Sequence, residues 1–234
     1  KGVIPFSDLL KAEAQMKDES NWDDLMALIY TSGTTGRSKA VMISQANASS
    51  AVQIFRPWLT KKAIDGEERL LGVYPIYHVA GFSTLQNLVL WCGWDSLLIP
   101  LPTPDSIIEV VKKYHPTYFP GVATIYAKLL KDKRFGKVRL SQVKGFFSGA
   151  SPFPREVVDA LEEVVKDFKI FDVYGTSEAT AYITTNPMQG GIYRKGTVGV
   201  PFPNTDLKIV DLENHDLEVD VGEKGVILVK GPQV

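Results

Sequence analysis

Two kinds of hydrophobic pattern alternate along this chain. Short apolar runs are typical of strands, whereas longer segments carry apolar residues at three- and four-residue intervals, as helices with one buried face do. The first pattern predicts strands at 25–30, 70–74, 96–100, 117–120, 143–147 and 169–174. The second predicts helices at 106–114, 122–131 and 155–168, and the polar opening at 6–20 is compatible with one more helix.

This alternation predicts the fold class. Strands separated by helices favour an α/β fold, in which a mostly parallel sheet is flanked by helices and binds ligands at the carboxyl ends of its strands. From about Gly191, glycines and prolines frame two short strands, 207–210 and 226–229, with no helix between them. We therefore expect an α/β core at 1–190 and the start of a small β-rich subdomain at 191–234.

Composition and charge narrow the classes of partner. Of the 234 residues, 44% are apolar and 23% are charged, which fits a globular chain with a core of ordinary size. The 26 basic and 27 acidic side chains nearly cancel, so no overall field favours nucleic acid or an anionic membrane. We expect no nucleic-acid partner, and a polyanionic ligand would need local positive groups.

The single cysteine and the length of the apolar runs bear on location. Cys92 has no partner for an internal disulfide, which agrees with a reducing cytoplasm, and its apolar neighbours predict a buried packing role. Polar residues interrupt every apolar stretch before it reaches the roughly 18 residues of a membrane span, and no signal peptide is recognisable. The chain begins without methionine and stops just after a predicted strand, so we interpret it as a fragment of a cytoplasmic protein.

The strongest local signal is the loop that follows the strand at 25–30. Its two glycines can turn backbone N–H groups toward an anion, its hydroxyls add donors, and Lys39 adds a positive charge. The spacing from glycine to lysine departs from the Walker pattern, which disfavours an ordinary P-loop nucleotidase. The loop is therefore either a phosphate cradle or a flexible Ser/Thr/Gly turn. A cradle would use Thr31, Ser32, Gly33, Thr34, Thr35, Gly36 and Lys39.

Three more residues admit a functional and a plain interpretation. Glu178 follows the strand at 169–174, where a carboxylate can bind Mg²⁺ beside phosphate oxygens, although a surface glutamate is equally ordinary. Tyr174 can form a flat wall for an aromatic ligand or belong to the core. His78, taken alone, reads more readily as a structural histidine than as a catalytic one.

Five segments occur in the order found in the adenylate-forming superfamily, which this chain resembles and which includes acyl-CoA synthetases, firefly luciferase and the adenylation domains of peptide synthetases. The segments are the loop at 31–39, Tyr74-Pro-Ile-Tyr-His78, Ser148-Gly-Ala-Ser-Pro152, Tyr174-Gly-Thr-Ser-Glu178, and Gly196-Thr-Val-Gly-Val-Pro201 with Lys208-Ile-Val-Asp211. The resemblance covers the chain from about Asp24 to Val234 and implies a fragment of the family's large N-terminal domain.

The resemblance implies ATP, Mg²⁺ and coenzyme A, and it assigns roles to residues. His78, Lys39 and Glu178 are the expected catalytic residues, and Thr31 and Glu178 are the expected metal ligands. The expected nucleotide-binding residues are the cradle residues together with Gly149, Ala150, Ser151, Asp172, Val173, Tyr174, Gly175, Thr176 and Ser177. His78 is also expected beside the acid, where Val79, Ala80, Gly81, Gly121 and Gly145 are expected to leave room for an apolar chain. We expect the cradle and the strand before it at the carboxyl edge of the parallel sheet, close to Tyr174 and Glu178.

Some positions depart from the family pattern. Ser38, Ala40 and Ser177 stand where proline, glycine and threonine are usual, and Ser38 gives up the rigid φ of proline. His115 and His215 match no motif and are expected to be structural or exposed. The 234 residues also lack the family's ribose-binding aspartate, its hinge and its small C-terminal domain, so we expect the isolated chain to be inactive or incomplete.

The resemblance implies ATP-dependent activation of a carboxylic acid, which we expect to be a fatty acid, to acyl-AMP, followed by transfer to coenzyme A. The segment from Tyr74 to His78 lacks the aspartate with which peptide-synthetase domains hold an amino group, and 117–126 is similar to fatty acyl-CoA ligases. An aryl-CoA ligase or another adenylate-forming enzyme is one alternative, and a non-catalytic nucleotide-binding module is another. The expected partners are small molecules, and a homodimer is left open.

Overall fold

A five-stranded sheet forms the centre of the computed structural model, which describes residues 19–32, 37–59, 61–166 and 168–234. Its strands are parallel and lie in the order β4-β3-β5-β6-β7. Each strand overlaps a predicted apolar run, and the sheet confirms the predicted α/β class. The strands are β3 (Arg69–Gly72), β4 (Asp95–Leu98), β5 (Tyr118–Pro120), β6 (Gly145–Gly149) and β7 (Ile170–Val173).

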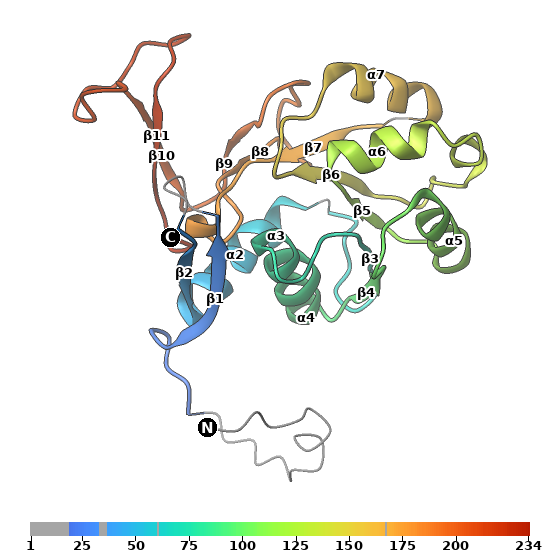
Figure 1. Cartoon of the computed structure of the whole chain (residues 1–234), viewed down its shortest axis with the longest axis horizontal. Coiled ribbons are helices and arrows are strands. Elements are labelled where there is room, and N and C mark those ends of the chain that lie inside the picture. The colour runs from blue at the N-terminus through green and yellow to red at the C-terminus, as the bar shows by residue number, and fades with distance from the viewer. Residues whose placement is uncertain (1–18, 33–36, 60, 167) are drawn as a thin grey trace.

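Helices cover both faces of this sheet (Figure 1). Neighbouring strand residues face opposite layers, because Phe119 and Phe146 pack with the first helical layer whereas Tyr118 and Phe147 pack with the second. Burial on both faces explains why the strands read as continuous apolar runs. The first layer contains α5 (Pro104–Tyr114), α6 (Ala123–Leu130) and α7 (Arg155–Val164). The second contains α2 (Gln45–Phe55) and a continuous helical segment formed by α3 (Val79–Gly81), the π-helix η2 (Phe82–Leu88) and α4 (Val89–Cys92).

The ends of the predicted helices follow from local chemistry. Helix α5 begins at Pro104, whose fixed φ suits a first turn, and the Thr103 side chain caps it. Helix α7 ends at Val164, before the predicted end at 168, because Val165 turns to an extended conformation. That turn lets Phe168 pack on Phe146 with ring centroids 4.9 Å apart.

The strand predicted at 25–30 does not join the parallel sheet, so that expectation was wrong. It forms β1 (Leu25–Thr31), which pairs antiparallel with β2 (Lys39–Ser44) in a separate two-stranded sheet. The connection at 32–38 is too short for a parallel crossover, which takes about a dozen or more residues. Gly33, Thr34, Thr35 and Gly36, in this connection, lie outside the described residues.

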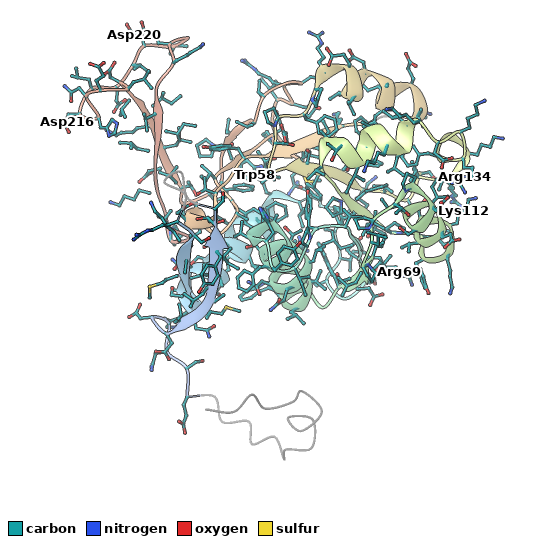
Figure 2. The ribbon with its side chains drawn as sticks, in the orientation of Figure 1. Trp58, Arg69, Lys112, Arg134, Asp216 and Asp220 are labelled. Atoms are coloured by element: carbon teal, nitrogen blue, oxygen red, sulfur yellow. The ribbon has the colours of Figure 1, made fainter. Side chains whose placement is uncertain are left out.

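The last part of the chain is built from antiparallel pairs. β8 (Thr184–Thr185) pairs with β9 (Val200–Pro201), and β10 (Asp206–Val210) pairs with β11 (Val226–Lys230). β10 and β11 match the two strands predicted after Gly191. They project from the body as an arm in Figure 1, and Figure 2 places Asp216 and Asp220 near its tip.

Several smaller predictions concern exposure. Cys92 is buried as predicted, and burial raises the pKa of its thiol to about 11. His115 and His215 are both exposed, as expected. Lys112 is exposed on α5, on the side of the molecule away from the β1–β2 hairpin (Figure 2). Among the described residues, no helix is both long enough and apolar enough to cross a membrane.

Candidate active site

The carboxyl edge of the parallel sheet brings the predicted site residues together. Strands β3, β5, β6 and β7 end at the same edge because neighbouring parallel strands run in one direction. The segments that leave this edge carry His78 after β3, Ala150 after β6 and Tyr174 after β7. Two cavities open here, and they share Ala150, Val173 and Gly175 in their walls. A ligand bound in one cavity therefore lies beside a ligand bound in the other.

The larger cavity has a volume of about 370 Å³ and a half-buried tyrosine in its wall. The backbone N–H of Tyr174 donates to the Thr184 carbonyl at 3.0 Å, and the Tyr174 carbonyl accepts from the Ile183 N–H at 3.0 Å. A ring held in this way offers a flat surface on which a purine base can stack. The lining residues that belong to the expected nucleotide-binding set are Ala150, Ser151, Asp172, Val173, Tyr174 and Gly175. Gly149 lines the smaller cavity instead.

Asp172 gives the larger cavity a titratable group. Burial raises the pKa of this carboxyl to about 6, and a hydrogen bond from the Phe153 backbone opposes the shift. The Asp172 carbonyl accepts from the Thr185 hydroxyl at 3.1 Å, which fixes the backbone here. When ionised, the side chain can accept a hydrogen bond from an exocyclic amino group such as that of adenine.

The wall of the larger cavity also contains Asn186, a residue that the sequence did not single out. Asn186 is buried, its side-chain amide donates to the Thr197 carbonyl at 2.8 Å, and its side-chain carbonyl accepts from the Arg194 N–H at 2.9 Å. These bonds tie the segment around Thr197 to the strand edge. A single asparagine in a loop gives no sequence signal for this role.

The β1–β2 hairpin and Glu178 lie on the same side of the fold. Glu178 is exposed in the short helix η4 (Ser177–Ala179), and β2 lies next to η4. Thr31 and Lys39 are opposite each other in the antiparallel register, so their side chains share one face of the hairpin. The expected neighbourhood of hairpin and carboxylate is therefore found, although the hairpin is not part of the parallel sheet.

The residues present fit a magnesium ion that is bound mainly through substrate. Within the described ranges, no group of three or more His, Cys, Asp or Glu side chains could hold a metal. Mg²⁺ commonly keeps several waters and uses one or two carboxylates together with phosphate oxygens. The exposed carboxylate of Glu178 and the hydroxyl of Thr31 suit this mode, in which ATP supplies further oxygens.

The smaller cavity lies beside His78 and is walled mainly by apolar side chains. His78 is exposed at the start of α3, and its Nδ1 accepts from the Ala80 N–H at 3.1 Å. A neutral imidazole that accepts at Nδ1 carries its proton on Nε2, where it can donate to an oxygen of a substrate. The other residues that line the cavity are Phe55, Tyr74, Val79, Ala80, Thr84, Pro120, Phe147, Ser148, Gly149, Ala150, Val173, Gly175, Ala181 and Tyr182.

The three glycines expected around the acid do not share one place. Gly81 fits tightly against the Pro75 carbonyl, and Gly121 accepts a hydrogen bond from the Tyr74 hydroxyl at 3.0 Å next to the smaller cavity. Gly145 begins β6 and so lies at the opposite, amino edge of the sheet. A Cβ there would come 2.6 Å from the Met188 methyl group, so the space is filled by protein, and Gly145 lines neither cavity.

A strained turn connects Glu178 to the smaller cavity. Thr180 and Ala181 have φ values of 47° and 82°, in the left-handed region that costs about 1–3 kcal/mol for such residues. The Thr180 hydroxyl donates to the Gln233 carbonyl at 2.7 Å, and the Ser83 hydroxyl donates to the Thr180 carbonyl at 3.1 Å. Gly175 closes the turn, because a Cβ there would lie 1.6 Å from the Ala181 carbonyl oxygen. Contacts with Ser83 of η2, with Gln233 and with Gly175 therefore hold the turn in place.

The chain is similar to known proteins over nearly its whole length. The family model described as AMP-binding enzyme matches residues 3–234. A long-chain-fatty-acid–CoA ligase of Bacillus subtilis is 35% identical over 211 residues, which cover 90% of this chain and 37% of that protein. A 4-coumarate–CoA ligase-like protein of Oryza sativa is 29% identical, over 94% of this chain and 40% of that protein.

The fold is also found among solved structures. The ATP-bound crystal structure of MatB from Rhodopseudomonas palustris matches with a TM-score of 0.84 and 30% identity, over 94% of this chain and 42% of that one. The chain thus spans about two fifths of the length of the proteins that it matches.

Proposed function

Because this chain belongs to the AMP-binding enzyme family, we propose that the protein activates a carboxylic acid with ATP and transfers the acyl group to coenzyme A. The observation that carries the proposal is the pair of adjoining cavities at the carboxyl edge of the sheet. One has an aromatic wall and a polar rim suited to a nucleotide, and the other is apolar and adjoins His78. A nucleotide and an acid bound in them would meet near Ala150 and Gly175.

In the first step, a carboxylate oxygen attacks the α-phosphorus of ATP, the bond to the β-phosphate oxygen breaks, and acyl-AMP and pyrophosphate form. Both reactants are anionic, so most of the work is positioning and charge neutralisation. Lys39 on the hairpin would neutralise phosphate charge, and Nε2–H of His78 would donate to an oxygen near the reacting carboxylate. Mg²⁺, held by Glu178 and Thr31, would supply further positive charge against the phosphates.

In the second step, the thiol of coenzyme A loses its proton, its sulfur attacks the acyl carbonyl, and AMP leaves. The mixed anhydride hydrolyses readily, so the apolar cavity has a second use, which is to keep water from the acyl carbon. The chain spans about two fifths of the length of the relatives that it matches, and we propose that these 234 residues do not complete the reaction alone. The cytoplasm, which provides ATP and coenzyme A, is the proposed location.

The proposed class of acid substrate is inferred from the names of two relatives and from the residues that line the smaller cavity. The Bacillus subtilis relative is named for long-chain fatty acids, which favours an aliphatic acid here. The Oryza sativa relative is named for 4-coumarate, so an aryl acid is the second candidate. Phe55, Phe147 and Tyr182 provide apolar contacts that suit either class.

The test uses the full-length protein and acid-dependent exchange of labelled pyrophosphate into ATP. Exchange that requires both an acid and Mg²⁺ is expected, and its absence with every aliphatic and aromatic acid would reduce the protein to a nucleotide-binding module. Mass spectrometry of the thioester formed after coenzyme A is added then separates aliphatic from aryl substrates.

A further inference from the structure

The two charged groups of the proposed phosphate site lie on separate elements. Glu178 lies in the short helix η4, whereas Lys39 begins strand β2, which continues at Ser44 into helix α2. Phosphate and Mg²⁺ can be held together only if the lysine and the carboxylate keep a fixed separation. The site therefore needs a link between the turn that carries Glu178 and the elements that carry Lys39.

Gln233 is bonded to the turn that carries Glu178. The residue is completely buried, with a relative exposure of 0%. Its side-chain amide donates to the Tyr182 carbonyl at 3.1 Å and to the Thr205 hydroxyl at 2.9 Å. Its backbone carbonyl accepts from the Thr180 hydroxyl at 2.7 Å. Gln233 thus fixes the segment that directly follows η4 through both its side chain and its backbone.

The turn is tight enough to transmit this constraint to Glu178. The Thr180 N–H donates to the Ser177 carbonyl at 3.2 Å, and the Ala181 N–H donates to the Thr176 carbonyl at 3.0 Å. Both bonds enclose Glu178. Thr180 is β-branched and has a φ of 47°, a conformation that such a residue keeps only where its surroundings impose it. The position of Thr180 therefore determines the position of the Glu178 backbone.

Asn47 fixes the residues on both sides of Gln233 to helix α2. Its side-chain amide donates to the Pro232 carbonyl at 3.2 Å and to the Val234 carbonyl at 2.9 Å. Asn47 lies in the first turn of α2, and its backbone N–H donates at 3.1 Å to the hydroxyl of Ser44, the last residue of β2. Hydrogen bonds therefore connect β2 through α2 and the segment around Gln233 to the turn.

We propose that Gln233 is a positioning residue of the phosphate and magnesium site, which it serves by fixing the turn of Glu178 to the helix that follows the strand of Lys39. This inference rests on the proposed function and adds to it a residue that lines neither of the two cavities. Gln233 acts on the reaction through the position of the Glu178 carboxylate.

The test is a Mg²⁺ titration of acid-dependent pyrophosphate exchange by the full-length protein. Gln233→Met keeps the length of the side chain and removes the amide donor. The Mg²⁺ concentration for half-maximal exchange should rise by roughly tenfold or more, because a displacement of about 1 Å can cost roughly 100-fold in rate. A loss of folded protein alone would lower the maximal rate and leave this midpoint unchanged.

Gln142→Met is the matched control. It makes the same chemical change in the segment before β6, at the amino edge of the sheet. Among the described residues, the amide atoms of Gln142 have no hydrogen-bond partner, so the control removes no such bond. The Mg²⁺ midpoint of this variant should equal that of the wild type.

A double-mutant cycle asks whether Gln233 acts through Glu178. In a Glu178→Gln background the carboxylate is already absent, so Gln233→Met should change the exchange rate further by no more than about twofold. Equal losses in the two backgrounds would mean that Gln233 supports the fold alone.

Thr180 provides a second and milder test. Thr180→Val removes the hydroxyl that donates to the Gln233 carbonyl and should raise the Mg²⁺ midpoint, whereas Thr180→Ser keeps a hydroxyl and should keep the midpoint of the wild type. Thr180→Val loses a single hydrogen bond, and it replaces Gln233→Met in the titration and in the cycle if Gln233→Met does not fold.

The outcomes separate the positioning role from the proposed function. Unchanged Mg²⁺ midpoints in the folded Gln233→Met or Thr180→Val proteins, or additive effects in the cycle, would overturn the role of Gln233 and leave the proposed function intact. A wild type that shows no exchange with any acid would instead refute the proposed function itself.

Discussion

Replacing Gly175 by alanine tests whether the turn beside the two cavities is as tight as the structure indicates. The new Cβ would lie 1.6 Å from the carbonyl oxygen of Ala181 and 2.4 Å from its carbonyl carbon. Real Cβ atoms essentially never come closer than 3.0 Å to such an atom, so the carbonyl must move by at least 1.4 Å (3.0 − 1.6). It is main chain and cannot move without its neighbours.

The cost follows from what that movement disturbs. Forced overpacking costs about 1–3 kcal/mol. The same shift would weaken the hydrogen bond from the Ala181 N–H to the Thr176 carbonyl, now 3.0 Å, and the bond between Tyr182 and Thr84, each worth about 1 kcal/mol. We expect Gly175→Ala to lose about 3 kcal/mol of unfolding free energy.

The assay is urea unfolding of the protein, monitored by tryptophan fluorescence, with Gly136→Ala as the matched control. At Gly136 the nearest atom to a new Cβ is a Val164 methyl group at 3.8 Å, so alanine fits and should be neutral or slightly stabilising. If both variants unfolded within about 0.5 kcal/mol of the wild type, the turn would not be packed as described.

Two further substitutions test the proposed magnesium ligand Glu178 and the buried carboxyl of Asp172 in the larger cavity. Glu178→Gln should keep the fold, because the side chain is exposed, yet sharply lower pyrophosphate exchange at limiting Mg²⁺, and unchanged exchange would remove Glu178 from the metal site. Asp172→Asn tests the pKa that burial raises from 3.8 to about 6. The folded protein binds the Asp172 proton more tightly, so its stabilising contribution is complete below pH 4 and is lost as pH rises through about 6. The urea concentration at the unfolding midpoint should therefore rise for Asp172→Asn relative to the wild type between pH 4 and 6, when both are measured from pH 4 to 8. Midpoints that keep a constant difference over this range would contradict the burial of the carboxyl.

Strands of the parallel sheet were predictable because their signal is local. Residues such as Phe119 and Phe146 on one face, and Phe147 on the other, are all buried, which gives uninterrupted apolar runs. The destination of β1 was not predictable from its own residues, because a strand in a hairpin and a strand in a parallel sheet can have the same composition. The short connection at 32–38 was the available clue, since it is compatible only with an antiparallel partner.

The sequence patterns did not predict two helical segments of the second layer, and the reason differs between them. Helix α2 contains small and polar residues with no charged face, so its amphipathic pattern is weak. In the segment from Val79 to Cys92, buried positions include polar Ser83 and Thr84 and exposed positions include apolar Leu90 and Trp91, so polar and apolar residues do not separate into two faces.

Site residues in local sequence motifs were predictable, whereas site residues that meet only through tertiary packing were not. Tyr174, Gly175 and Ala150 were found through motifs, because short segments at strand ends carry them. Tyr182 and Thr84 are 98 positions apart in the chain and meet only through tertiary packing, so no spacing rule connects them. Gly145 shows the reverse error, since a small residue near a motif was taken as space for a ligand when Met188 fills that space.

The division of the site between two cavities has a consequence for how such proteins diversify. The nucleotide side is formed by strand ends and the turns that follow them, whereas part of the smaller cavity's wall comes from the second helical layer, including Phe55 of α2 and Thr84 of η2. Substitutions in that layer can change which acid enters without disturbing the phosphate chemistry. One ancestral scaffold could thus have given rise to ligases for unlike acids through a few exchanges of side chains, while the adenylating machinery was inherited unchanged.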